Sequence, residues 1–123
     1  MSWQPYVDRL VGDGDARQAA IFGLDGTELA TSPSFKVSAT EAQNIIAGIG
    51  GTAVHSGYKI AGVKYFILKH DDRSVFCKKG SSGAYMVKTK QHLLIGVYTE
   101  GIAPTKCEKA VQTLADYLSG IGY

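Results

Sequence analysis

Between residues 58 and 98 the chain carries a series of strand-like segments separated by turns of only a few residues. The expected strands cover residues 58–60, 63–70, 73–78, 84–88 and 92–98. Turns this short can join antiparallel neighbours, whereas parallel neighbours need a crossover of a dozen or more residues. The pattern therefore predicts an antiparallel meander and gives no support to a parallel, doubly wound sheet.

Helical patterns lie on either side of this meander. Residues 2–12 place apolar side chains at helical spacing behind Ser2, which is a good N-cap. The pair Ser38 and Glu41 forms a capping box at the start of a second helix. Thr105 and Glu108, after Pro104, are interpreted as another capping box that opens a C-terminal helix.

The order of these elements indicates the fold class. Asp25-Gly26 predicts a hairpin between the first two strands, so the order is helix, hairpin, helix, meander, helix. A chain of 123 residues, 45% of them hydrophobic, has the length of one domain and can bury one core. We therefore expect a single α+β domain over residues 1–123, with a central antiparallel sheet covered by helices.

Charge is unevenly distributed along the chain. Residues 59–90 hold eight basic and two acidic side chains, a net charge of +6, although the whole chain carries only +2. The central third is a candidate surface for anions or an acidic partner. The sequence has no apolar run long enough for a membrane span and no signal-peptide pattern, so we expect a cytoplasmic protein.

Little in the sequence indicates catalysis. Cys77 and Cys107 lie outside any CxxC motif, and the histidines are scattered, so we expect two free thiols and no metal site. No nucleophile and base stand in a recognisable motif, and Gly80-Ser81-Ser82-Gly83 lacks the spacing of a nucleophile elbow. We expect neither an enzyme nor a cofactor.

Aromatic residues gather at both ends of the chain. Trp3, the only tryptophan, and Tyr6 share one face of the first helix, and Tyr117 and Tyr123 lie in or beyond the last one. These rings could simply be core. Because terminal residues are seldom deeply buried, exposed rings with polar tips are the other interpretation, and they suit a polyproline II ligand.

Several stretches of the sequence give it a resemblance to profilins. They are 2–8 (SWQPYVD), 18–23 (QAAIFG), 71–76 (DDRSVF), 78–80 (KKG), 87–90 (VKTK) and 114–118 (LADYL). The resemblance spans the whole chain and is strongest to the short profilins of protists and fungi. It implies an antiparallel sheet with the two terminal helices packed on one face and smaller helices on the other.

The same resemblance implies function. The protein would bind monomeric actin and proline-rich partners such as formins, speed nucleotide exchange on actin and regulate its polymerisation at the cytoskeleton. It would also bind phosphatidylinositol bisphosphate at membrane surfaces, and it would act as a monomer without nucleic acid and without enzymatic activity.

Carried over by position, the polyproline-binding residues are Trp3, Tyr6, Leu29, Tyr117, Leu118 and Tyr123. Leu118 also lies on the apolar stripe of the last helix, so it is assigned to both core and site. Many relatives carry a second tryptophan where this chain has Leu29. Because leucine lacks an indole donor, and one hydrogen bond contributes about 0.5–1.5 kcal/mol, we expect weaker proline binding than in those relatives.

The implied actin-binding residues are Lys64, Lys69, Arg73, Lys78, Lys79, Ile102, Lys109 and Thr113. Four of these, Lys69, Arg73, Lys78 and Lys79, are also the expected phosphoinositide-binding residues. The independent charge count points to the same strands, and a positive segment would steer association with an acidic protein.

Two other functions remain open at this point. A basic β-sheet module could bind nucleic acid, with bases stacked on Tyr65 and Phe66 or on Phe76 and Tyr85. A small-ligand or catalytic domain could use a similar helix-covered sheet, although no motif indicates its chemistry.

Overall fold

The structure is a computed structural model that describes residues 2–51 and 56–123. Within these residues an antiparallel seven-stranded sheet has the order β2-β1-β7-β6-β5-β4-β3. The helices are α1 (Gln4–Gly12), α2 (Ala39–Gly48) and α3 (Pro104–Gly120). The strands are β1 (Gln18–Gly23), β2 (Glu28–Thr31), β3 (Gly57–Ile60), β4 (Val63–His70), β5 (Ser74–Lys79), β6 (Ser82–Lys88) and β7 (His92–Tyr98).

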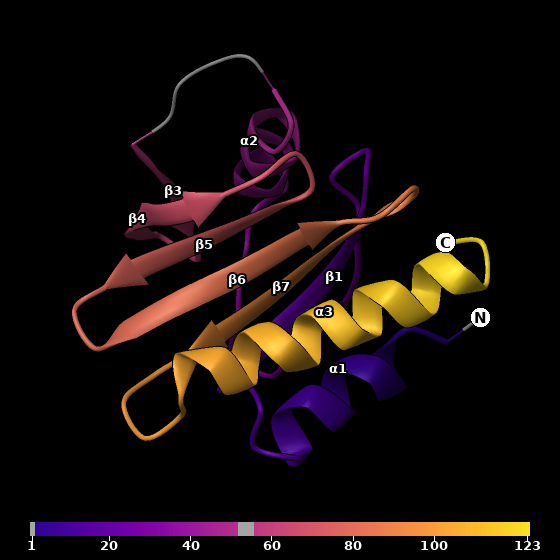
Figure 1. The fold of residues 1–123 in the computed structure, drawn as a ribbon. Coiled ribbons are helices and arrows are strands. Elements are labelled where there is room, and N and C mark those ends of the chain that lie inside the picture. Colours follow the sequence, from indigo (N-terminus) through magenta and orange to yellow (C-terminus); the bar gives the residue numbers. More distant parts are fainter. Residues whose placement is uncertain (1, 52–55) are drawn as a thin grey trace.

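Helices cover both faces of the sheet. Figure 1 shows α1 and α3 side by side on one face, running in opposite directions, so that the two ends of the chain lie close together. Helix α2 packs on the other face, where it is the one helix among the described residues. The α+β architecture is therefore confirmed, with one helix in the place of the several expected there. No described helix has both the length and the apolar character needed to cross a bilayer.

Alternation along the strands divides the core into two layers. In β1, Ala19 and Ile21 face α1 and α3, whereas Ala20 and Phe22 face α2. All of β7 is buried, as expected for the near-continuous apolar run of a strand covered on both faces. The central position of β7 places its first residue beneath the ends of α1 and α3.

The capping box of α2 is confirmed. The Ser38 hydroxyl accepts a hydrogen bond from the Glu41 backbone N–H at 3.1 Å, and the Glu41 carboxylate accepts one from the Ser38 N–H at 2.9 Å. The same carboxylate also accepts from the N–H groups of Ala61 and Gly62, at 3.1 and 2.8 Å. One side chain thus caps the helix and fixes it to the β3–β4 turn.

The starts of the two terminal helices differ from the prediction. Trp3, not Ser2, occupies the N-cap position of α1, and no side chain caps that helix. Thr105 lies inside the first turn of α3, because the helix begins at Pro104, so the second capping box is wrong. In α1 as well, a proline, Pro5, stands in the first turn. The fixed φ of proline favours helix there, and its missing N–H would have no intrahelical partner.

Helix α3 approaches the sheet most closely over Gly96 in β7. A Cβ added at Gly96 would lie 2.5 Å from the Val111 Cγ2 atom and 3.2 Å from the Cys107 sulfur. The absence of a side chain at this position therefore sets the distance between α3 and the sheet. Both cysteines, Cys77 and Cys107, are buried and free, and burial raises their thiol pKa values to about 12.

Candidate functional site

Four rings from the two ends of the chain meet in one cluster, which we call the aromatic cluster: Trp3, Tyr6, Tyr117 and Tyr123. Ring centroids are 6.3 Å apart for Trp3 and Tyr6, 5.3 Å for Trp3 and Tyr123, and 6.3 Å for Tyr6 and Tyr117. Tyr117 is 53% exposed, and the other three rings are partly exposed. The cluster therefore presents a continuous aromatic surface to solvent.

The antiparallel arrangement of α1 and α3 brings these rings together. It places the first residues of α1 beside the last turn of α3. Beyond α3 the chain turns back through Gly122, which has a φ of 99°, and the Tyr123 N–H donates to the Leu118 carbonyl at 2.8 Å. The Tyr123 carbonyl accepts from the Thr89 hydroxyl at 2.8 Å and from the Gln91 N–H at 2.9 Å. These bonds fix the last ring against the β6–β7 turn.

His92 lies beneath the cluster, and the sequence interpretation missed it. Its ring centroid is 4.3 Å from that of Trp3 and 5.7 Å from that of Tyr123. The side chain is buried, and its Nδ1 atom has no hydrogen-bond partner among the described residues. Burial lowers the pKa of His92, against a hydrogen bond to the Tyr123 backbone that raises it, so the ring is neutral at pH 7. The one sequence feature that could have indicated its burial is its position at the start of the apolar 92–98 segment.

The other two predicted polyproline residues differ from each other in exposure. Leu118 is 0% exposed and belongs to the core beneath α3, so its side chain is core rather than part of the exposed surface. Leu29 is 37% exposed on the edge strand β2. Ile21 pairs with Ala30 and Phe22 with Glu28, so Leu29 is the extra residue of a β-bulge, a feature that redirects side chains.

The phenols of the cluster are hydrogen-bonding groups. Burial, together with the adjacent Tyr117, raises the pKa of Tyr6, so this phenol keeps its proton at neutral pH. Neutral phenol and indole groups can donate to carbonyl oxygens, and their ring faces offer apolar area. The cluster can therefore bind a ligand with exposed carbonyls and apolar rings, and it carries no nucleophile or base for covalent chemistry.

A groove of about 670 Å³ continues from the cluster between α1 and α3. Tyr6 and Tyr117 line its near end, and its walls include residues from both helices. Two of the predicted actin-binding residues, Lys109 and Thr113, line this groove. They therefore belong to the side of α3 that faces α1.

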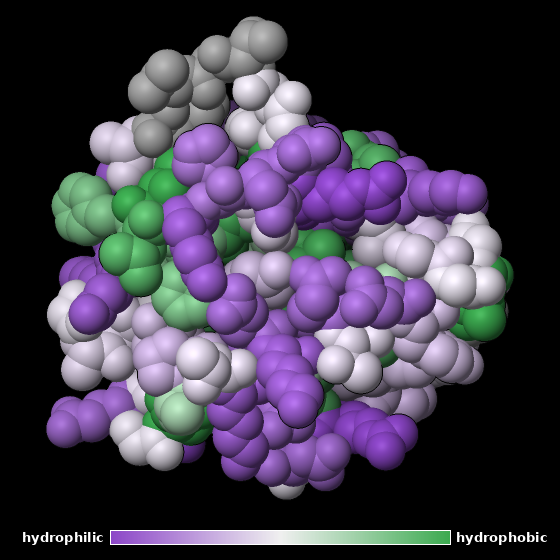
Figure 2. All heavy atoms as spheres, in the orientation of Figure 1, coloured by the Kyte–Doolittle hydropathy of each residue, from purple (hydrophilic) through white to green (hydrophobic). Residues whose placement is uncertain are grey.

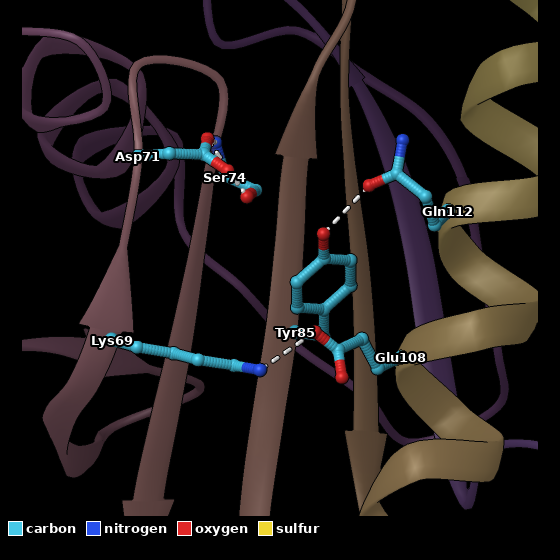
Figure 3. A network of polar contacts seen from close by, with 6 residues as sticks. All are labelled: Lys69, Asp71, Ser74, Tyr85, Glu108 and Gln112. Carbon is cyan, nitrogen blue, oxygen red and sulfur yellow. Dashed lines mark hydrogen bonds and ion pairs between the residues drawn. The ribbon is translucent and has the colours of Figure 1, made fainter.

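The predicted basic residues of β4 and β5 lie on the part of the sheet beside α3. The Lys69 ammonium is 3.3 Å from the Glu108 carboxylate and 5.5 Å from the ring centroid of Phe76. Figure 3 shows this ion pair bridging β4 and α3, next to a hydrogen bond of 2.6 Å from the Tyr85 hydroxyl to Gln112. Charged and polar groups thus connect the exposed strands to α3.

The remaining predicted residues are spread around this surface. Lys64 and Lys78 are exposed, and their alternation with buried neighbours places them on the α3 side of the sheet, whereas Lys79 follows at the end of β5. Arg73 lies in the β4–β5 turn, where its N–H donates to Asp71 at 2.8 Å. This bond is the main cause of a lowered pKa for Asp71. Ile102 is partly buried against the core.

Two apolar residues of β4 are exposed, and of these the sequence interpretation named only Phe66, as a ring on which bases could stack. Phe66 is 57% exposed and Leu68 is 62% exposed. Figure 2 shows an apolar patch over the β3–β4 side of the molecule, surrounded by hydrophilic side chains. Leu68 lies at a register shift between β4 and β5, which breaks the alternation that sequence patterns rely on.

Most of the rings expected to stack with bases of a nucleic acid are not exposed in the structure. Tyr65, Phe76 and Tyr85 are buried, and of the four proposed rings only Phe66 is exposed. Because bases need open ring faces for stacking, that part of the alternative is wrong. The described residues also hold no group of His, Cys, Asp and Glu side chains that could bind a metal ion.

Comparison with known proteins gives consistent matches over the full chain. The family model described as Profilin matches residues 1–123. Profilin-1A of Acanthamoeba castellanii is 47% identical over 126 residues, and the alignment covers 100% of both chains. The solved structure of Acanthamoeba castellanii profilin IA superposes with a TM-score of 0.94 at 46% identity, covering 99% of this chain and 100% of that chain.

Two more distant structures share the fold and contain partners. One is a complex of LokiProfilin2 with rabbit actin, similar at 19% identity with a TM-score of 0.77 over 95% of each chain. The other is mouse profilin IIa in complex with a double repeat from the FH1 domain of mDia1, at 20% identity and a TM-score of 0.80 over 100% of each chain. At these identities the likeness concerns the fold, and the partners are those of the two proteins.

Proposed function

Because this chain belongs to the profilin family, we propose that it binds actin monomers on one surface and proline-rich segments on another. The family is non-enzymatic, and the proposed mechanism involves no covalent chemistry. We propose that residues 1–123 form a single domain that carries both sites and works as a monomer in the cytoplasm and at the cytoskeleton.

The observation that carries the proposal is the contact among Trp3, Tyr6, Tyr117 and Tyr123 in one exposed surface. A polyproline II segment is stiff and loses little entropy on docking, and its carbonyls are free to accept hydrogen bonds. The related mouse profilin IIa is bound to a repeat of an FH1 domain, which supports a formin as a partner for this chain.

The proposed actin surface comprises the basic residues of β4 and β5, with Lys109, Thr113 and Ile102 as further candidates. The basic residues of β4 and β5 lie apart from the aromatic cluster, whereas Lys109 and Thr113 line the groove that continues from it. Actin bound on the strands would leave the cluster free for a second partner. A proline-rich partner would then raise the local concentration of actin near a filament end. Exchange on actin would accelerate if the protein bound a more open actin conformation better than the closed one.

The single tryptophan allows a direct test of the proline site. Poly-L-proline should change the intrinsic emission of the protein, and any indole response reports Trp3. Lys69→Glu combined with Arg73→Glu should weaken actin binding and leave this titration intact. If both activities fell together in a folded variant, the assignment of two separate surfaces would be wrong.

Leu29 provides a second test of the same site. Leu29→Trp should strengthen binding of a proline decamer, because it adds an indole donor and more apolar area at an exposed bulge. Equal affinity of wild type and variant would argue against a role of Leu29 in the site.

We also propose that Lys69, Arg73, Lys78 and Lys79 bind phosphatidylinositol bisphosphate. Co-sedimentation with vesicles that contain this lipid should be lost in a Lys78→Glu, Lys79→Glu variant. Retention at wild-type levels would contradict the assignment. Because these residues are shared with the proposed actin surface, the lipid should also compete with actin.

A further inference from the structure

The groove between α1 and α3 extends well beyond the aromatic cluster. We propose that this groove extension, formed by Arg9, Leu10, Lys109, Ala110 and Leu114, binds the residues that directly flank a proline run. We propose further that it selects an aliphatic residue followed by acidic ones. The inference rests on the proposed binding of proline-rich segments and adds a preference for their sequence.

The groove extension is continuous with the aromatic cluster. Tyr6 and Tyr117 contribute both to the cluster and to the near end of the groove. One turn of α1, from Tyr6 to Leu10, advances about 6 Å, and a polyproline II segment advances about 3.1 Å per residue. About two ligand residues beyond Tyr6 therefore reach Leu10.

The floor of the groove extension is apolar. Leu10 is buried, and Ala110 and Leu114 are partly buried against the same core. These side chains offer aliphatic surface with no hydrogen-bonding group directed at a ligand backbone. An aliphatic side chain next to the proline run can therefore replace water here, which is favourable in proportion to the apolar area covered.

Among the residues that line the groove, the charged side chain nearest the rings on each helix is a cation. On α1 this is Arg9, three residues after Tyr6, and on α3 it is Lys109, two turns before Tyr117. Arg9 is 3.7 Å from Asp13 in an ion pair whose side chains are 83% and 59% exposed. Lys109 has no ion pair with any residue that the structure describes. Exposed pairs contribute little, so both cations can turn to a ligand carboxylate.

The far end of the groove is less available to an acidic ligand. Lys106 is paired there with Asp15, at 3.9 Å, and Asp13 adds a second carboxylate. Counted over the whole lining, three cations face two carboxylates. Arg9 lies within one turn of Tyr6, whereas Lys109 lies about 12 Å along α3 from Tyr117, so the preference concerns roughly the first four ligand residues beyond the rings.

Titration of Trp3 emission with a set of peptides tests the inference. The peptides are decaproline alone, decaproline followed by Leu-Glu-Glu, decaproline preceded by Glu-Glu-Leu, and the matching lysine peptides. One of the two acidic peptides should bind about fivefold more tightly than decaproline at low salt, a gain expected of two exposed charge contacts. The gain should shrink at about 0.3 M salt, and the lysine peptides should bind no more tightly than decaproline.

Charge reversal provides the matched comparison. In an Arg9→Glu, Lys109→Glu variant the preference should invert, so that a lysine peptide binds more tightly than the acidic one, with each affinity expressed relative to decaproline. A Lys36→Glu, Lys59→Glu variant changes net charge equally at exposed residues outside the groove lining and should keep the wild-type preference.

The outcomes separate this inference from the proposed function. Binding of decaproline with no advantage for either acidic peptide would overturn the inference and leave the proline site intact. Retention of the acidic preference in the Arg9→Glu, Lys109→Glu variant would overturn it as well. Failure of decaproline itself to bind would refute the proposed proline site, and the inference with it.

Discussion

Tyr117 and Leu118 are neighbours in α3, yet substitution to alanine should affect different properties. Leu118 is 0% exposed and packs in the core between α3 and the sheet. Leu118→Ala should therefore lower the free energy of unfolding by about 2–5 kcal/mol, from lost burial and the cavity left behind. For a domain of this size, at about 4 °C per kcal/mol, that corresponds to a melting temperature roughly 8–20 °C lower.

Tyr117→Ala should instead affect binding. The side chain is 53% exposed, and its ring contacts that of Tyr6 at a centroid distance of 6.3 Å. Loss of such a pair costs about 0.5–1.5 kcal/mol, so stability should change by about 1 kcal/mol or less. Affinity for a proline decamer should fall by about 1–2 kcal/mol, or roughly 5- to 30-fold, because one of four rings of the proposed surface is removed.

Urea unfolding followed by circular dichroism, together with the Trp3 titration under native conditions, measures both effects. Leu118→Ala should lower the urea midpoint strongly with an unchanged slope, whereas Tyr117→Ala should lower it by much less. The reasoning is refuted if Leu118→Ala unfolds at the wild-type urea concentration. It is also refuted if Tyr117→Ala binds the decamer as wild type does.

Three further predictions concern stability and reactivity. The folded pKa of His92 lies below its unfolded value of about 6.5, so the stability that its neutral form contributes is present above pH 6.5 and lost as the pH falls through the folded pKa. The urea midpoint of the wild type should therefore drop between about pH 7 and 5, and the midpoint of His92→Gln should drop less. Equal drops in the two proteins would contradict this prediction. Gly96→Ala should cost about 1–3 kcal/mol in unfolding free energy, because the added methyl group overlaps α3, and an unchanged melting temperature would count against it. Burial raises the thiol pKa values of Cys77 and Cys107 to about 12, so both should resist a thiol reagent at about pH 8 until urea unfolds the protein. Rapid labelling of the native protein would contradict this prediction.

Much of the fold follows from local sequence signals. The capping box of Ser38 and Glu41, the Asp25-Gly26 hairpin and the short turns of the meander all depend on residues close together in the chain. The physical interactions that they report are therefore visible in the sequence. Local signals also misled, as at Thr105, where a capping pattern was overridden by the proline that precedes it.

The candidate site, too, was predictable from the sequence only in part. The sequence indicated that Trp3 and Tyr123 carry aromatic surface, but it gave no physical reason for the two ends of the chain to meet. That contact depends on the antiparallel packing of α1 and α3 over a shared core. The buried position of His92 beneath Trp3 depends on β7 lying inside the sheet, between β1 and β6.

Sequence by itself therefore determined which segments are helices and strands, and that the sheet is antiparallel, because hydrophobic periodicity and turn chemistry act over a few residues. Tertiary structure decided between the two roles that the sequence left open for Leu118, by burying its side chain completely, and it showed that Lys109 faces the groove beside α1. The exposure of a side chain on a helix depends on what packs against that helix, and the partner here lies at the opposite end of the chain.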